Sequence, residues 1–167
     1  MSKPPVAVRP ALPEDILQIS SLHIASWRAA YDGIIDATYL QTMDIARHAI
    51  MWQRALDADA RILVAESEAR VIGFANANRN EITVLYIDPA HWRRGAGSLL
   101  LHRMLEDIAA TEQAEAWLWV LQGNTAARTF YESQGGRLQG SAPVKVGLQT
   151  LVQVRYVWQL PGARQAI

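Results

Sequence analysis

The sequence predicts an α/β protein built on one mixed, mostly antiparallel sheet of six or seven strands with about four flanking helices. Three observations predict this fold. Short aliphatic segments that suit strands alternate with longer segments of helical periodicity. The segments 81–87 and 116–121 both suit strands and are joined by a helix, so they should be parallel neighbours. The chain has 167 residues, half of them hydrophobic, which suits a single domain spanning 1–167.

The first third of the chain is predicted to contain one strand and two helices. Pro13 is followed by two acidic residues, a composition typical of a first helical turn. Gly33 should end that helix, and Asp44 precedes the next helical pattern. The expected elements are a strand over 6–9 and helices over 13–31 and 45–56.

The remainder alternates strands with two further helices. The segment after Gly97 places its apolar residues on one helical face and exposes Arg103, Glu106 and Asp107. Residues 76–80 look like a turn, so the strands before and after them should pair antiparallel. The expected strands are 61–66, 71–75, 81–87, 116–121, 136–140 and 148–158, and the expected second helix is 125–133.

The run from Leu85 to Leu101 is the most informative motif. It is predicted to form a buried strand that stops at Pro89, a basic glycine-containing turn with Arg93 and Arg94, and an amphipathic helix. The first N–H groups of such a helix have no partner within it, and the helix dipole is positive there, so this end suits a diphosphate. The spacing matches neither the dinucleotide-binding nor the Walker glycine pattern.

A second motif follows about 25 residues later. The strand ending at Leu121 leads to Asn124, and Phe130-Tyr131 comes near the end of the next short helix. Together the two motifs resemble the acyl-CoA-binding core of the GNAT superfamily of N-acetyltransferases. Gly95 and Gly97 match the two small positions of that family's turn, whereas its leading Gln/Arg position falls on Trp92.

The resemblance implies that acetyl-CoA is the co-substrate and that the strands 81–87 and 116–121 splay apart to admit its pantetheine arm. It also implies a bulge at the end of the first strand, which frees a backbone N–H near Tyr86 or Ile87 for the thioester oxygen. Solvated surface arginines and an ordinary core strand are the alternative interpretations. The expected cofactor-binding residues are Leu85, Tyr86, Ile87, Arg93, Arg94, Gly95, Ala96, Gly97, Ser98, Asn124 and Tyr131.

Two residues are the candidate catalytic groups. Tyr131 matches the tyrosine that the family directs at the cofactor sulfur, where it acts as general acid; alternatively it is a half-buried packing residue. Glu81 is the candidate base, expected on the same strand face as Ile87 because the two are six residues apart; alternatively it is an exposed strand-start residue. Asn124 is expected to bind the pantetheine arm, to cap the helix, or both.

The acceptor side is expected to involve aromatic residues near the first helix. Trp27, Tyr31 and Tyr39 are candidate walls of an amine pocket, although Trp27 and Tyr31, four apart on a helix, could simply pack together. His23 and His91 are expected to be structural or exposed.

Composition excludes several classes of protein. The formal net charge is zero and the chain has no cysteine. We therefore expect no nucleic-acid partner bound by bulk positive charge, no disulfide and no cysteine nucleophile. No metal-ligand cluster, signal peptide or membrane span is expected, and a cytoplasmic location is the default.

The sequence therefore predicts an N-acetyltransferase that moves an acetyl group directly to a primary amine of a small molecule or peptide. A non-catalytic acyl-CoA-binding regulatory protein and a transferase for longer acyl chains are the alternatives. The apolar last strand, with Val152, Val154, Tyr156 and Trp158 on one face, could form a homodimer interface or be buried within the monomer.

Overall fold

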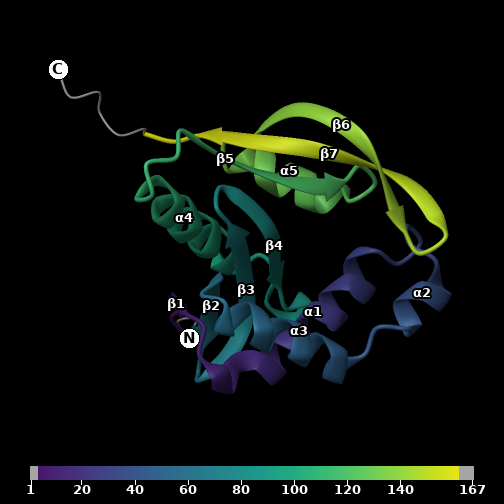
Figure 1. Cartoon of the computed structure of the whole chain (residues 1–167), viewed down its shortest axis with the longest axis horizontal. Coiled ribbons are helices and arrows are strands. Elements are labelled where there is room, and N and C mark those ends of the chain that lie inside the picture. The colour runs from purple at the N-terminus through teal and green to yellow at the C-terminus, as the bar shows by residue number, and fades with distance from the viewer. Residues whose placement is uncertain (1–3, 162–167) are drawn as a thin grey trace.

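The computed structural model describes residues 4–161, which form one seven-stranded sheet in the order β1-β2-β3-β4-β5-β7-β6 (Figure 1). Every neighbouring pair is antiparallel except β4 and β5, which are parallel. The predicted mixed sheet is confirmed. Its strands are β1 (Ala7–Pro10), β2 (Arg61–Ser67), β3 (Arg70–Asn78), β4 (Glu81–Ile87), β5 (Glu115–Leu121), β6 (Arg137–Val146) and β7 (Gln149–Gln159).

The predicted helices form close to their expected bounds, after a short turn of 3-10 helix at Pro13–Asp15. Asp44 opens the second long helix, because its Oδ1 accepts the N–H of Arg47 at 2.9 Å. A five-residue helix after Asp36 was not predicted, since one turn is too short to show a periodic pattern. The helices are α1 (Ile16–Ala30), α2 (Ala37–Gln41), α3 (Ile45–Asp57), α4 (Ala96–Ala109) and α5 (Thr125–Ser133).

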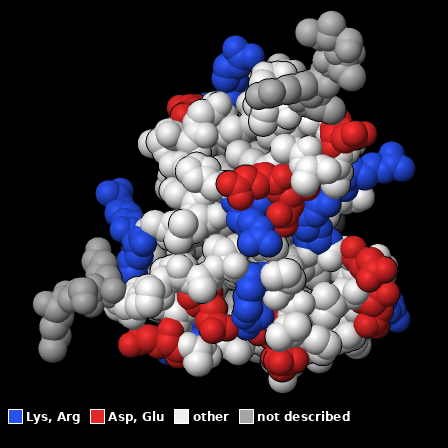
Figure 2. All heavy atoms as spheres, turned by 90° about the vertical axis from the view of Figure 1, so that its left-hand side faces the viewer, with Lys and Arg blue, Asp and Glu red and all other residues white. Residues whose placement is uncertain are grey.

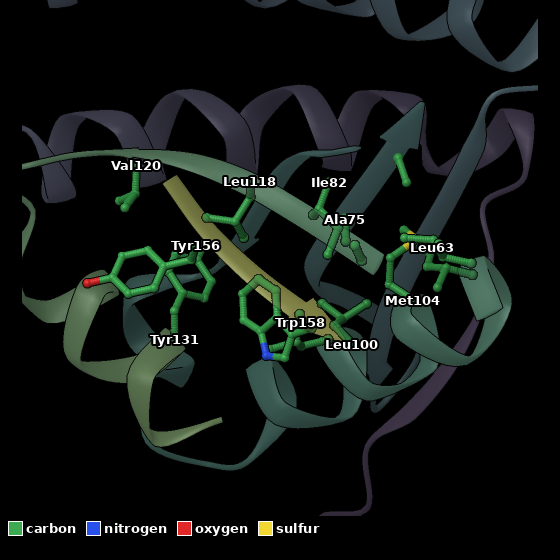
Figure 3. Close-up of a cluster of buried hydrophobic side chains, with 14 of the residues drawn as sticks. Leu63, Ala75, Ile82, Leu100, Met104, Leu118, Val120, Tyr131, Tyr156 and Trp158 are labelled. Carbon is green, nitrogen blue, oxygen red and sulfur yellow. The ribbon is translucent and has the colours of Figure 1, made fainter. Parts of the chain in front are cut away.

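Helices cover both faces of the sheet. On one face, α4 and α5 contribute Leu100, Met104 and Tyr131 to a core with side chains of β2, β3, β4, β5 and β7 (Figure 3). On the other face, α1 and α3 contribute Ile19 and Trp52 to a second core with β2, β3 and β4. This burial of apolar area stabilises the sheet that positions the site described below.

The parallel pair β4–β5 meets only at its beginning. The register contains one pair, Glu81 with Trp117, and the Trp117 N–H donates to Asn80 O at 3.0 Å. After this pair, no further residues of β4 and β5 are paired by backbone hydrogen bonds. The expected parallel, splayed pair is therefore confirmed.

Two strands are longer than predicted. Residues 76–78 were expected in a turn but continue β3, because Asn76 still pairs with Val84 and Asn78 with Glu81. The turn is left to Arg79 and Asn80. β6 also runs on to Val146. It is mostly exposed, lies at the sheet edge and pairs along its length with the long strand β7.

The apolar side chains of β7 are mostly buried within the monomer. Val154, Tyr156, Val157 and Trp158 are buried, whereas Val152 is 45% exposed. On the face drawn in Figure 2, basic and acidic side chains are interspersed and form no large patch of one sign. Among residues 4–161 no helix has the length and apolar character needed to cross a bilayer.

Candidate active site

The splay between β4 and β5 opens into a cavity of about 830 Å³. Its lining comes from β4, β5, the end of α1, the turn before α4, and α5. This volume lies within the range of about 300–1,000 Å³ that is typical of ligand pockets. The parts of the chain that the sequence singled out separately, 85–98 and 124–131, therefore meet around one space.

The beginning of α4 forms one end of the cavity. Gly95 is the N-cap residue, with φ of 85°, a conformation that favours glycine. The first helical hydrogen bond runs from the Leu99 N–H to Gly95 O at 3.1 Å. The N–H groups of Ala96, Gly97 and Ser98 precede it and have no helical partner. No acidic residue occupies this first turn, so the end keeps the positive potential of the helix dipole.

Neighbouring residues shape this end. Arg93 and Arg94 are exposed and line the cavity. A Cβ on Gly97 would lie 3.2 Å from Phe130 Cζ, so α4 and α5 can approach this closely only around a small residue. Trp92 Nε1 donates to Ile87 O at 2.8 Å. Trp92 occupies the position where the motif usually has Gln or Arg. Its indole connects the turn to the end of β4 through this hydrogen bond.

The bulge in β4 lies nearer its start than expected. The register with β3 shifts between Asn76 and Ala77, which makes Thr83 the extra residue. The prediction of a bulge at the end of the strand is therefore wrong. The bulge falls next to the only β4–β5 register pair, and it increases the local twist where the two strands separate.

The bulge and the pairing decide which backbone groups face the cavity. The Asp88 N–H donates to Ile72 O on the β3 side at 2.8 Å. Because alternate residues of an antiparallel pair exchange hydrogen bonds, the Tyr86 N–H also faces β3. The N–H groups of Leu85 and Ile87 then point to the side that β5 has left. Ile87 N–H, rather than that of Tyr86, is thus the group directed at the gap.

The same bulge moves Glu81 to the opposite face from the one predicted. Ile82 and Ile87 both pack against the core under α4 and α5, although five residues separate them. The alternation of β4 side chains between the two faces of the sheet is therefore shifted by one residue at Thr83. Glu81 shares its face with Tyr86, which packs against the core under α1 and α3. Glu81 is half-buried beside Trp117 and is not among the residues that line the cavity.

Asn124 and Tyr131 lie on the α5 side of the cavity. Asn124 Oδ1 accepts the Ala127 N–H at 3.2 Å, which makes it the N-cap of α5 and leaves its amide nitrogen for other partners. Tyr131 is buried, with its ring edge-to-face against Trp158 at 5.9 Å. Burial, and then the nearby Tyr31, raise the pKa of Tyr131 well above its ordinary value.

Tyr31 also lines this cavity, at the end of α1. Its ring packs edge-to-face on Trp27 at 4.9 Å, and Trp27 Nε1 donates to the hydroxyl of Tyr86 at 2.7 Å. Trp27 reaches the cavity only through these two tyrosines. Tyr39 lies elsewhere: it is 36% exposed and its ring covers Gly147 in the β6–β7 turn.

The two histidines occupy different settings. His23 is buried against Tyr86, with ring centroids 5.3 Å apart, and its Nδ1 accepts from Trp52 Nε1 at 3.3 Å. Burial, assisted by His48, lowers the pKa of His23 to about 4. His91 lines the cavity, and its Nδ1 lies 3.2 Å from Asp88 Oδ2.

Sequence reasoning missed several lining residues. Ser26, Ala29 and Ala30 line the α1 side. These small residues at positions i, i+3 and i+4 of one helix mark a face where another part of the molecule approaches closely, a signal that was present in the sequence. Phe130 lines the α5 side of the cavity. It is part of the second motif, but no role in binding was predicted for it.

Comparisons with known proteins bear on the family and the fold of this chain. Residues 21–136 match the Acetyltransferase (GNAT) family. A probable N-acetyltransferase of Mycobacterium tuberculosis is 28% identical over 148 residues, which are 81% of this chain and 82% of the relative. A GCN5-related N-acetyltransferase structure from Rhodopseudomonas palustris has a TM-score of 0.78 at 21% identity, covering 96% of this chain and 98% of that one. The PaiA N-acetyltransferase of Thermoplasma acidophilum, solved with coenzyme A, has a TM-score of 0.75 at 19% identity, covering 93% and 99%.

Proposed function

This chain belongs to the acetyltransferase (GNAT) family, and we propose that it transfers an acetyl group from acetyl-CoA to a primary amine within a ternary complex. One observation carries the proposal. The unpaired N–H groups at the start of α4 and the gap between β4 and β5 border the same cavity. A ligand with a diphosphate at one end and an extended arm at the other matches this combination. We propose residues 1–167 as a single domain with this activity.

Cofactor binding is assigned to the turn and the two strands. The N–H groups of Ala96, Gly97 and Ser98, with Arg93 and Arg94, would hold the diphosphate. The pantetheine arm would extend along the β5-facing edge of β4 at Leu85 and Ile87. The free amide nitrogen of Asn124 would contact it from the α5 side.

The chemistry is assigned to groups at the inner end of the cavity. The Ile87 N–H would stabilise the thioester oxygen as it gains negative charge. Tyr131 would donate a proton to the departing thiolate, because its high pKa keeps it protonated. Glu81 would take the amine proton through water, since it lies on the α1 face of β4 and outside the cavity lining.

The acceptor would enter from the α1 side, past Ser26, Ala29 and Tyr31. The test uses purified protein, acetyl-CoA and a panel of amines that includes small alkylamines, amino acids and peptides. Calorimetry should show cofactor binding, and free thiol should appear together with an equal amount of acetylated amine. Binding without transfer to any amine would favour the non-catalytic regulatory protein. Absence of binding would overturn both functions.

A further inference from the structure

The final residue of β4, Ile87, directs both of its backbone groups into the gap. The Asp88 N–H donates to Ile72 O at 2.8 Å, so Asp88 and Tyr86 face β3 and Ile87 faces the side that β5 has left. A residue in an extended strand directs its own N–H and C=O to the same side. The Ile87 N–H, assigned above to the thioester oxygen, therefore shares its edge with the Ile87 carbonyl.

This arrangement creates a conflict at the proposed contact with the thioester. The Ile87 N–H would attract the thioester oxygen as it gains negative charge. The Ile87 carbonyl oxygen carries partial negative charge itself and would repel the thioester oxygen from the same edge. A carbonyl that has lost its strand partner also needs a new donor. The site therefore requires a group that covers Ile87 O and leaves the N–H free.

Trp92 supplies that group. Its Nε1 donates to Ile87 O at 2.8 Å, within the range of about 2.7–3.2 Å for a good N–H···O bond. Ser26 Oγ lies 3.5 Å from the same oxygen, which is too long for a strong bond. The indole lines the cavity and is 48% exposed, and it belongs to none of the hydrophobic clusters of the described residues. Hydrogen bonding, rather than core packing, is thus its main contribution here.

A short turn brings Trp92 back to the end of β4. The turn is a 3-10 helix at Pro89–His91, capped by Asp88, whose Oδ1 accepts the Ala90 N–H at 3.0 Å. The His91 N–H donates to Asp88 O at 2.7 Å. The chain reverses within these residues, so the side chain of Trp92 can reach a carbonyl five positions earlier. The peptide group after Ile87 is then held at both ends, by Ile72 through its N–H and by Trp92 through its oxygen.

We propose that Trp92 is a positioning residue for acyl transfer and acts through the Ile87 carbonyl. The proposal rests on the proposed acetyl transfer. The indole N–H offsets the negative end of the carbonyl, so the edge offers the thioester oxygen a donor without an opposing acceptor. It also keeps the end of β4 in one orientation, and a donor that is already aligned needs no reorganisation as charge develops. Because the benefit grows with the charge on the oxygen, it belongs to the transition state and not to cofactor binding.

The test is Trp92→Phe, which keeps an aromatic ring at the cavity and removes the N–H. Loss of an oxyanion donor itself lowers kcat about 10²- to 10³-fold, and Trp92 acts one group away, so we expect a smaller loss of about tenfold. The KM for acetyl-CoA should change less than about threefold. Calorimetry with CoA, which has no thioester carbonyl, should give the wild-type Kd. Because Trp92 is half-exposed, the variant should fold with a Tm close to that of the wild type.

Trp52→Phe is the matched control. The Nε1 of Trp52 also donates a hydrogen bond, to His23 Nδ1 at 3.3 Å, but Trp52 lies outside the cavity lining. It should retain the wild-type kcat. A Trp92→Phe variant with wild-type kcat would overturn the proposal. So would a variant with weakened CoA binding, because Trp92 would then contact the cofactor itself. A wild type that acetylates no amine would instead refute the proposed function, and this inference with it, so the two failures are distinguishable.

Discussion

Gly97→Glu is the sharpest perturbation of the proposed cofactor site. Gly97 is the second residue of α4 and lines the cavity. A Cβ there would lie 3.2 Å from Phe130 Cζ and 3.6 Å from Ile87 Cγ1, so a longer side chain must extend into the space meant for the ligand. The carboxylate would also repel the diphosphate and compete for the free N–H groups of α4.

The expected magnitude follows from ligand linkage. At a concentration of acetyl-CoA 100 times Kd, the folded state gains about 2.7 kcal/mol. For a domain of this size each kcal/mol raises Tm by about 2–4 °C, so the wild type should gain roughly 5–11 °C. Gly97→Glu should gain less than about 1 °C, because little ligand would remain bound. The ligand-free variant should still fold, because the Phe130 ring needs to move by only a few tenths of an ångström and an acidic residue near a helix N-terminus is favourable by about 0.3–1 kcal/mol.

The assay is a thermal melt with and without acetyl-CoA, and Gly140→Glu is the matched control. Gly140 lies in β6, outside the cavity, and a Cβ there meets nothing within 4 Å. The same change of charge at that position should leave the full rise in Tm. If Gly97→Glu also retains the full rise, the diphosphate does not bind at the start of α4 and the reasoning is refuted.

Two further predictions concern stability. Gly73→Ala should lower the free energy of unfolding by about 1–3 kcal/mol in urea melts, because a Cβ would lie 2.4 Å from Ile87 Cδ1 and 3.0 Å from the Tyr86 carbonyl oxygen; a loss below about 0.5 kcal/mol would contradict this. The buried His23, with its pKa lowered to about 4, binds fewer protons than the unfolded chain between pH 6.5 and 4, so stability should fall as pH decreases through that window. The loss from pH 7 to 5 should be about 2 kcal/mol, and His23→Gln should remove it; an unchanged pH dependence in that variant would assign the effect to other groups.

Local sequence was enough to predict most of the fold. The apolar periodicities of 81–87, 96–109 and 116–121 each specify their own element, because alternation and helical spacing are properties of neighbouring residues. The caps were equally local, since Asp44 and Asn124 bond to N–H groups three residues ahead. Strands whose length is set by pairing with the next strand were predicted too short: β6 follows β7, and the end of β3 follows β4.

The candidate site divides in the same way. The sequence by itself determined the glycine turn, the basic residues beside it and the seven-residue spacing of Asn124 and Tyr131, because these are patterns of neighbouring residues. Only the tertiary structure decided which face of the sheet each site residue occupies and which residues surround the cavity. One extra residue at Thr83 turned Glu81 away from the face of Ile87, and folding placed Tyr31 and Asn124 around the same cavity. Strand register and contacts between distant helices depend on the whole packed core, so no local pattern encodes them.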